Sequence, residues 1–137
     1  MTRLGDVSDF AIPRPLVTLE EYFTGNNDPS SIGDVRIREF TPEQFFTALK
    51  ALRDRADVYD VRVEVKAPKT PDGRPATDTI WIVTSLDRME LPLRGMSSEF
   101  WDRFLPDDWL TFPRRDGRIT ESLEIPNSMH GFGFYYY

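Results

Sequence analysis

Two stretches, VYDVRVEVK (Val58 to Lys66) and DTIWIVTS (Asp78 to Ser85), decide the fold that we expect for this chain. In the first, Tyr59 and the valines after it alternate with charged residues, which predicts a strand with one face on a core and the other in water. The second stretch is more apolar. A Pro/Gly-rich segment joins them and supplies turn chemistry, so we expect antiparallel pairing. Trp81 would then share a face with Arg62, either shielding a sheet edge or serving as a ligand platform.

Capping signals predict two helices on the N-terminal side of these strands. Thr18 and Glu21 have the spacing of a capping box, which predicts a short helix. Thr41, followed by a proline and by Gln44, predicts a second one. Apolar residues at helical spacing give the second helix a stripe that we expect to pack in the core: Phe45, Phe46, Leu49 and Leu52.

Weaker patterns complete the predicted architecture. Alternation predicts strands at 34–40 (DVRIREF) and 119–125 (ITESLEI), and Ser85 or Asp87 would cap a short helix. The chain is expected to form one α+β domain over residues 1–137, with residues 1–16 as an extended N-terminal arm. Its sheet would be antiparallel with helices packed on one face, in an order resembling the ferredoxin-like β-α-β-β-α-β sandwich.

Composition narrows the classes of function. The chain has 137 residues, a net charge of -6 and no cysteine. The missing cysteines exclude disulfides, thiolate zinc sites and a cysteine nucleophile. The acidic balance argues against nucleic-acid binding and fits a basic partner. Without a signal-peptide core or a long apolar run, we expect a cytoplasmic protein that does not enter a membrane.

No set of residues indicates catalysis. His130 is the only histidine, and no G-x-S-x-G motif accompanies it, so enzyme activity is disfavoured. The acceptor-rich loop from Gly25 to Gly33 lacks the full spacing of a calcium site. No cofactor or metal is expected. A small-molecule-binding or hydrolytic domain with a pocket between sheet and helices remains the alternative.

The C-terminal stretch HGFGFYYY resembles the aromatic consensus of RNA-recognition motifs, whose exposed rings stack on bases. Here the chain ends directly after the stretch, and His130 stands where that consensus has Lys or Arg. We therefore expect a terminal strand with alternate rings in the core. Binding of single-stranded RNA through this strand is a more remote alternative.

Three segments, TLEEYFTGNNDPSSIG (Thr18 to Gly33), VYDVRVEV and DTIWIVTS, resemble a pattern in small uncharacterised bacterial proteins. The resemblance implies a bacterial, stand-alone domain. It implies no activity and no functional residues.

The sequence therefore favours a non-catalytic protein–protein interaction domain. One concrete form is a bacterial immunity-type protein that covers a basic surface of its partner. An aromatic ending that pairs two copies as a homodimer is an alternative. The predicted partner-binding residues combine aromatic rings with acidic neighbours: Trp109, Tyr135, Tyr136, Tyr137, Asp107 and Asp108.

Overall fold

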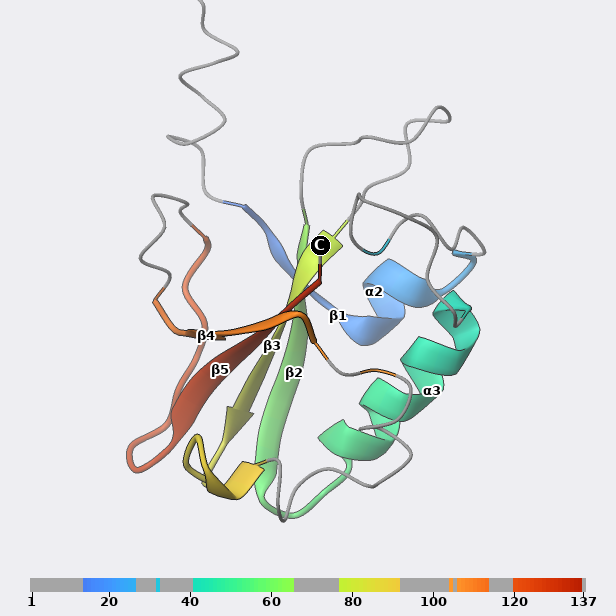
Figure 1. Ribbon diagram of the computed structural model, residues 1–137. Helices are drawn as coiled ribbons and strands as arrows, with labels where there is room; N and C mark the ends of the chain where they lie inside the picture. The colour runs from blue at the N-terminus through green and yellow to red at the C-terminus, as the bar shows by residue number, and fades with distance from the viewer. Residues whose placement is uncertain are drawn as a thin grey trace, which may run out of the picture.

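The computed structural model describes residues 14–26, 32, 41–65, 77–91, 104, 106–113 and 120–136 (Figure 1). Within these residues the chain forms a five-stranded sheet and two α-helices. In chain order the elements are β1 (Leu16–Thr18), α2 (Leu19–Phe23), α3 (Pro42–Arg53), β2 (Val58–Val65), β3 (Thr77–Thr84), β4 (Asp108–Thr111) and β5 (His130–Tyr135).

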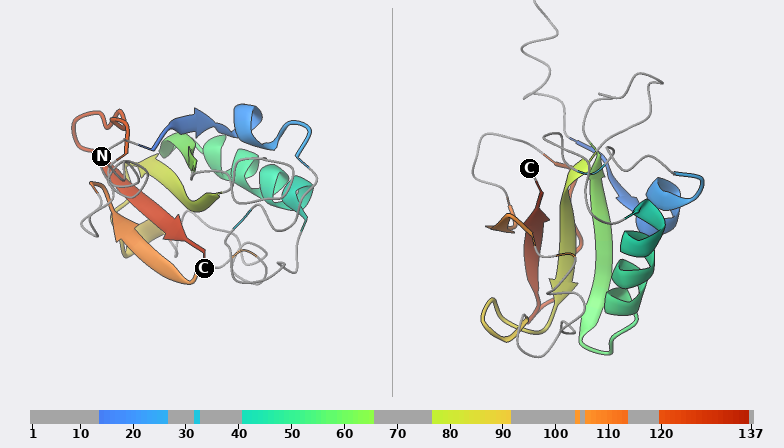
Figure 2. Two further views of the ribbon diagram at one scale, coloured as in Figure 1. Left: turned by 90° about the horizontal axis from the view of Figure 1, so that it is seen from above. Right: turned by 45° about the vertical axis from the view of Figure 1, so that its right-hand side comes forward.

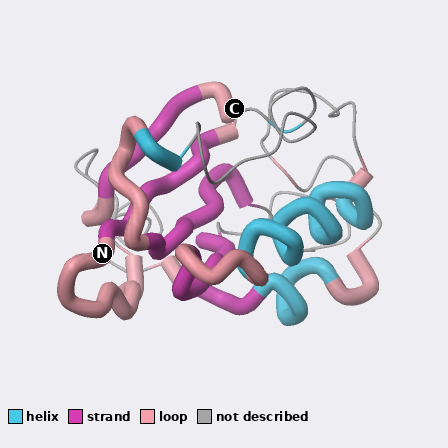
Figure 3. The backbone as a smooth tube through the Cα atoms, turned by 90° about the horizontal axis from the view of Figure 1, so that it is seen from below, coloured by secondary structure: helices cyan, strands magenta, loops and turns pink. Residues whose placement is uncertain are grey.

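Each pair of neighbouring strands is antiparallel, and the strand order is β1-β2-β3-β5-β4. The two helices lie together against one face of it, here called the helix face (Figures 2 and 3). The predicted α+β class, with helices on one face of an antiparallel sheet, is confirmed. The arrangement differs from a ferredoxin-like one in one respect. Among the described elements, β1 pairs directly with β2, although α2 and α3 both lie between these strands in the sequence.

The predicted hairpin is formed by β2 and β3, and Arg62 lies opposite Trp81 as expected. The register shifts between Val58 and Asp60, so Tyr59 becomes an extra residue in its strand. The bulge turns this ring out of the core, and Tyr59 is 45% exposed. Its predicted place beside the valines is therefore wrong.

Reciprocal caps confirm both predicted helix starts. The hydroxyl of Thr18 accepts from the Glu21 N–H at 3.0 Å, and the Glu21 carboxylate accepts from the Thr18 N–H at 2.8 Å. Thr41 and Gln44 make the same exchange at 3.1 and 2.9 Å. Each exchange satisfies two backbone groups that the first helical turn leaves unpaired.

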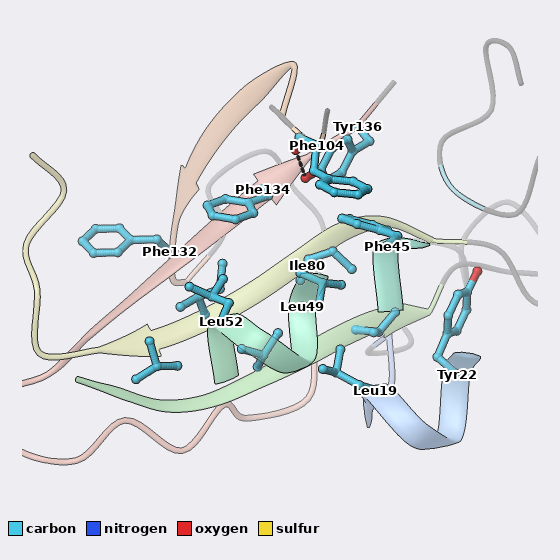
Figure 4. Packing of buried hydrophobic residues seen from close by; sticks show 14 of the residues in the cluster. Leu19, Tyr22, Phe45, Leu49, Leu52, Ile80, Phe104, Phe132, Phe134 and Tyr136 are labelled. Atoms are coloured by element: carbon cyan, nitrogen blue, oxygen red, sulfur yellow. Dashed lines mark hydrogen bonds between the residues drawn. The ribbon is translucent and has the colours of Figure 1, made fainter. Parts of the chain in front are cut away.

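The main core lies between the helices and the sheet and has an aromatic centre (Figure 4). Phe45 stacks on Phe104 with ring centroids 5.5 Å apart, and it meets Tyr136 edge to face at 5.3 Å. The predicted stripe on α3 is confirmed, with three buried members and a half-buried one: Phe45, Leu49, Leu52 and Phe46.

The other side of the sheet, here called the opposite face, is covered by the chain between Thr120 and Met129. A second apolar cluster forms under this cover from Trp81, Val83 and Leu123, with Leu16, Leu110, Phe112, Ile125 and Met129 packed against it. The strand predicted at 119–125 is wrong for the described part, since within 120–126 the one ladder contact is a bridge from Thr120 to Arg14. Its alternation reflects side chains that turn toward the sheet, not strand pairing.

The C-terminal strand is present as predicted, but it lies between β3 and β4. Phe132 and Phe134 point to the helix face and are buried. The glycines that alternate with them, Gly131 and Gly133, face the other way, Gly131 toward Leu123 and Ile125 and Gly133 toward Trp81. A Cβ on Gly133 would lie 3.0 Å from the Trp81 ring, so the glycine lets this ring lie directly against the backbone.

Several predicted features fall outside the described residues. They are the strand at 34–40, the tip of the β2–β3 connection, most of the acceptor-rich loop and the first thirteen residues of the arm. The end of the arm belongs to the fold, because Leu16 pairs with Glu64 in the β1–β2 ladder. In the part of the chain that the structure describes, no helix is long and apolar enough to cross a membrane.

Candidate functional site

Most of the predicted partner-binding residues meet at the start of β4. Asp108 lies opposite Tyr135 in the β4–β5 ladder, and the Asp107 N–H donates to the Tyr135 carbonyl at 2.8 Å. Trp109 follows, opposite Phe134. Asp107 and Asp108 are exposed, whereas Trp109 and Tyr135 are half-buried. Pairing with β5 thus gathers four of the predicted residues at one edge of the sheet, with Trp109 on the helix face and with Asp108 and Tyr135 on the opposite face.

Tyr136 does not belong to this surface. It is 1% exposed, and its hydroxyl donates to the Phe104 carbonyl at 2.6 Å (Figure 4). Successive side chains of an extended chain point to opposite sides, so Tyr135 and Tyr136 cannot both face outward. The assignment of Tyr136 to a partner surface is therefore corrected to a place in the core. Tyr137 lies outside the described residues.

The Trp109 ring is held by two neighbours. It meets Phe134 edge to face with centroids 4.9 Å apart, and this contact ties it to the main core. The guanidinium carbon of Arg88 lies 3.8 Å from the centroid of the same ring. This separation is well within the range of cation–π attraction. Trp109 therefore has one side in the core and already holds a cation.

A capped turn presents Arg88 to this ring. The Asp87 carboxylate accepts from the Met89 and Glu90 N–H groups at 2.9 and 2.8 Å, and the Glu90 carboxylate accepts from the Asp87 N–H at 3.0 Å. Asp87 is thus the cap, one of the two predicted. The turn leaves Met89 71% exposed. Buried leucines fix the turn at both ends: Leu86 and Leu91.

One outward amide of β4 is capped by a side chain. Within the described residues, β4 has a paired strand on one side only, β5. The Phe112 N–H donates inward to the Gly131 carbonyl at 3.0 Å. Because amides of an antiparallel strand alternate in direction, those of Trp109 and Thr111 point away from β5. The Trp109 N–H donates instead to the Asp108 carboxylate at 2.8 Å.

A buried cluster of polar side chains on the opposite face of the sheet was not predicted. Arg14 Nη1 lies 2.8 Å from Glu64 Oε2 and 3.4 Å from Asp78 Oδ1. The other oxygen of Glu64 accepts from the Trp81 Nε1–H at 2.8 Å. Glu64 and Trp81 are 0% exposed and Arg14 is 8% exposed. We call these four residues the Arg14 cluster, and its burial and mutual pairing indicate a structural role.

The Arg14 cluster corrects two predictions. Glu64 was expected to face water, but the chain from Thr120 to Met129 covers its side of the sheet. Trp81 was expected either to shield an edge or to form a ligand platform. It lies on the central strand β3, fully buried and hydrogen-bonded to Glu64, so it does neither.

The alternative functions find less support in the geometry. A hollow lined by Arg55, Ala56, Asp57 and Ser85 lies at the end of α3 and β3, where Arg55 and Asp57 already form a two-bond ion pair at 3.0 Å. Among the residues described, no group of three or more His, Asp or Glu side chains is arranged to hold a metal ion.

Two rings of the aromatic strand are not accessible to RNA bases. Phe132 is 5% exposed and Phe134 is 0% exposed, so the rings that would stack on bases are inside the core. His130 is exposed at the start of β5 and stacks on Phe132 with ring centroids 5.8 Å apart.

Comparisons with known proteins agree with the resemblance seen in the sequence. Residues 1–114 match the model of the "Uncharacterized protein YfbO family". The chain is also similar to the "Uncharacterized protein YfbO" of Escherichia coli (strain K12), with 32% identity over 128 residues that cover 92% of this chain and 85% of that protein. No match to a solved structure was found. On the extent of these two matches, the chain belongs to the YfbO family of bacterial proteins.

Proposed function

We propose that the protein is a non-catalytic binding domain that engages a basic protein partner. The contact would be made by the β4 surface, which we define by six residues: Arg88, Met89, Asp107, Asp108, Trp109 and Tyr135. An immunity-type protein that covers a basic surface of a toxin is one concrete form of this role.

The packing of the Trp109 ring is the observation that carries the proposal. Its ring is fixed against Phe134 and carries Arg88 at 3.8 Å, and the next residue in the turn, Met89, is 71% exposed. Trp, Arg and Met are enriched in protein interfaces, and Trp and Arg in particular supply much of the binding energy. A ring that is already held in place loses little conformational freedom on binding.

Charge supports a basic partner. Asp107 and Asp108 are exposed at the start of β4, and the whole chain carries a net charge of -6. Complementary charge speeds the encounter of two proteins and disfavours partners of the wrong sign. Rim carboxylates of this kind contribute mainly to the association rate, so their effect should weaken as salt rises.

The test is capture of a partner from bacterial extract on the immobilised protein, followed by binding kinetics with that partner once it is purified. The loss variants are the pair Asp107→Asn with Asp108→Asn, and Trp109→Leu. Asparagine keeps an oxygen that can accept the Trp109 N–H, so the paired variant changes charge with little change in structure. Glu43→Gln, at an exposed position on α3, is the matched charge control.

The proposal predicts one basic partner that the wild type and Glu43→Gln retain. The paired Asp variant should lower its association rate by about tenfold at low salt, and by less at high salt. Trp109→Leu should mainly raise the dissociation rate. A partner that binds all these variants equally would rule out the β4 surface, and an acidic partner would contradict the charge argument.

A further inference from the structure

We propose that the partner binds by strand addition, with an extended basic segment pairing along the outer side of β4. This inference rests on the proposed function and specifies how the β4 surface recognises its partner. It starts from the position of β4, which is the last of the described strands in the order β1-β2-β3-β5-β4. Figure 2 shows β4 at the end of the sheet, beyond β5.

The outer side of β4 has backbone groups in the arrangement that a further strand requires. The inward bond from Phe112 to Gly131 sets the alternation, so the amides of Thr111 and Trp109 face outward. These two positions are separated by one residue, which is the spacing at which an antiparallel neighbour forms its hydrogen-bonded pairs. Main-chain bonds supply affinity in this mode of binding, and side chains supply specificity.

Asp108 controls access to this edge. Its carboxylate accepts the outward Trp109 N–H at 2.8 Å, which occupies one of the two amides and places a negative charge on the edge. Capped and charged edges resist indiscriminate pairing with other strands. A segment with a lysine or arginine opposite Asp108 would draw the carboxylate away from the amide and into an ion pair. The cap would thus select for a basic segment.

The charge of the edge also argues against a second copy of this chain as the occupant. Each copy carries a net charge of -6, so two copies repel each other. If Trp109 of one β4 strand paired with Thr111 of the other, Asp108 would lie opposite Phe112, which offers the carboxylate no cation. An extended basic segment of another protein meets the same carboxylates as ion-pair partners.

Thr111→Pro tests the mode directly, because proline removes the outward amide. Proline is tolerated on an edge strand when its missing N–H faces solvent, so the fold should persist. Thr111→Ala is the matched control, since it keeps the amide. The probes are two short peptides with blocked ends, one alternating lysine and threonine and the other alternating glutamate and threonine. Binding is followed by NMR, and so is hydrogen exchange of the Trp109 and Thr111 amides in the wild type.

Strand addition predicts that the lysine peptide slows exchange of the Thr111 amide by about tenfold at a peptide concentration about ten times its dissociation constant. Thr111→Pro should abolish binding and Thr111→Ala should retain it, while the glutamate peptide should bind neither protein. Equal binding to both Thr111 variants, or slowed exchange confined to other residues, would overturn the inference. So would a concentration-dependent dimer of the free wild type that Thr111→Pro disrupts, because the edge would then belong to a second copy.

The exchange measurement keeps the test decisive if Thr111→Pro fails to fold. The two proposals also fail in different ways. If the captured partner depends on Asp107 and Asp108 but binds Thr111→Pro normally, the β4 surface stands and strand addition is wrong. If the paired Asp variant has no effect on that partner, the proposed function itself is wrong.

Discussion

The two faces of the sheet bury their side chains by different means. On the helix face, rings and aliphatic chains pack around Phe45, which stacks on Phe104 at 5.5 Å. On the opposite face, Trp81 shares the interior with Arg14 and Glu64, joined by bonds of 2.8 Å. The helix face is stabilised by the removal of apolar area from water. Such a core tolerates side-chain substitutions that conserve volume. The opposite face depends on specific partners, because a buried charge without its partner is costly.

The largest effect should come from breaking the Arg14 cluster. Arg14→Met keeps much of the side-chain volume but leaves the carboxylates of Glu64 and Asp78 buried without the guanidinium that lies 2.8 and 3.4 Å from them. We expect the free energy of unfolding to fall by about 3–5 kcal/mol, measured by urea denaturation. On the helix face, the volume-conserving change Leu49→Met should cost less than about 1.5 kcal/mol.

A double variant separates lost charge from lost packing. Adding Glu64→Gln to Arg14→Met removes one buried charge and still offers an oxygen to Trp81, so part of the loss should return. If the two changes instead add up, or if Arg14→Met costs no more than Leu49→Met, the contrast between the faces is wrong.

The same contrast explains what could be predicted from the sequence. Periodicity and capping signals act over a few residues, so the helix at Thr41, its stripe and the hairpin were found. The Arg14 cluster joins residues 50 and 64 positions apart, and no local pattern links them. Its cover, 120–129, has an alternating pattern but makes a single bridge, from Thr120 to Arg14, and otherwise packs through side chains. One local signal was available, namely a charged residue, Glu64, in a strand whose neighbour carries the apolar run from Ile80 to Val83.

Gly133 offers a sharper test of packing on the opposite face. An added methyl group would lie 3.0 Å from the buried Trp81 ring and 3.2 Å from Leu110 Cβ. Neither neighbour is a flexible chain end, so Gly133→Ala should lower the free energy of unfolding by about 1–3 kcal/mol. Urea denaturation measures the loss. A neutral result would mean that Trp81 can shift, which the bond from its indole to Glu64 should prevent.

The candidate site was predicted in part, for reasons that the strand geometry explains. Asp107, Asp108 and Trp109 were chosen for residue type, and pairing with β5 brings Tyr135 beside them. Tyr136 was misplaced because three successive tyrosines give no alternation from which to read a face. Arg88 and the exposed Met89 next to it were missed, because Arg88 reaches the Trp109 ring on β4 from a turn that is distant in the sequence.

A smaller effect should follow from removing the cap of α3. Thr41 accepts from the Gln44 N–H at 3.1 Å, so Thr41→Ala leaves a backbone donor of the first turn without this partner. We expect a loss of about 1 kcal/mol, measured as a shift of the urea midpoint at constant slope. Thr41→Ser retains a hydroxyl and should restore most of the stability. Equal losses for both variants would point to lost packing of the threonine methyl group instead.

The smallest effect should be a pH-dependent contribution from the ion pair that joins the two helices. Arg53 holds Glu20 by two bonds of 2.8 and 2.6 Å and lowers the pKa of that carboxyl to about 2 from 4.5. A lowered folded-state pKa stabilises the protein above pH 4.5, and the contribution is lost as the pH falls toward 2. The Glu20 side chain is 52% exposed, so solvent screening keeps the contribution below about 1 kcal/mol. Glu20→Gln should therefore lower the free energy of unfolding by a few tenths of a kcal/mol at neutral pH. This difference from wild type should shrink as the pH falls from 4.5 toward 2.

The control is the same comparison on an Arg53→Met background, which should show no such pH dependence. A difference that persists there would assign the effect to another neighbour of Glu20.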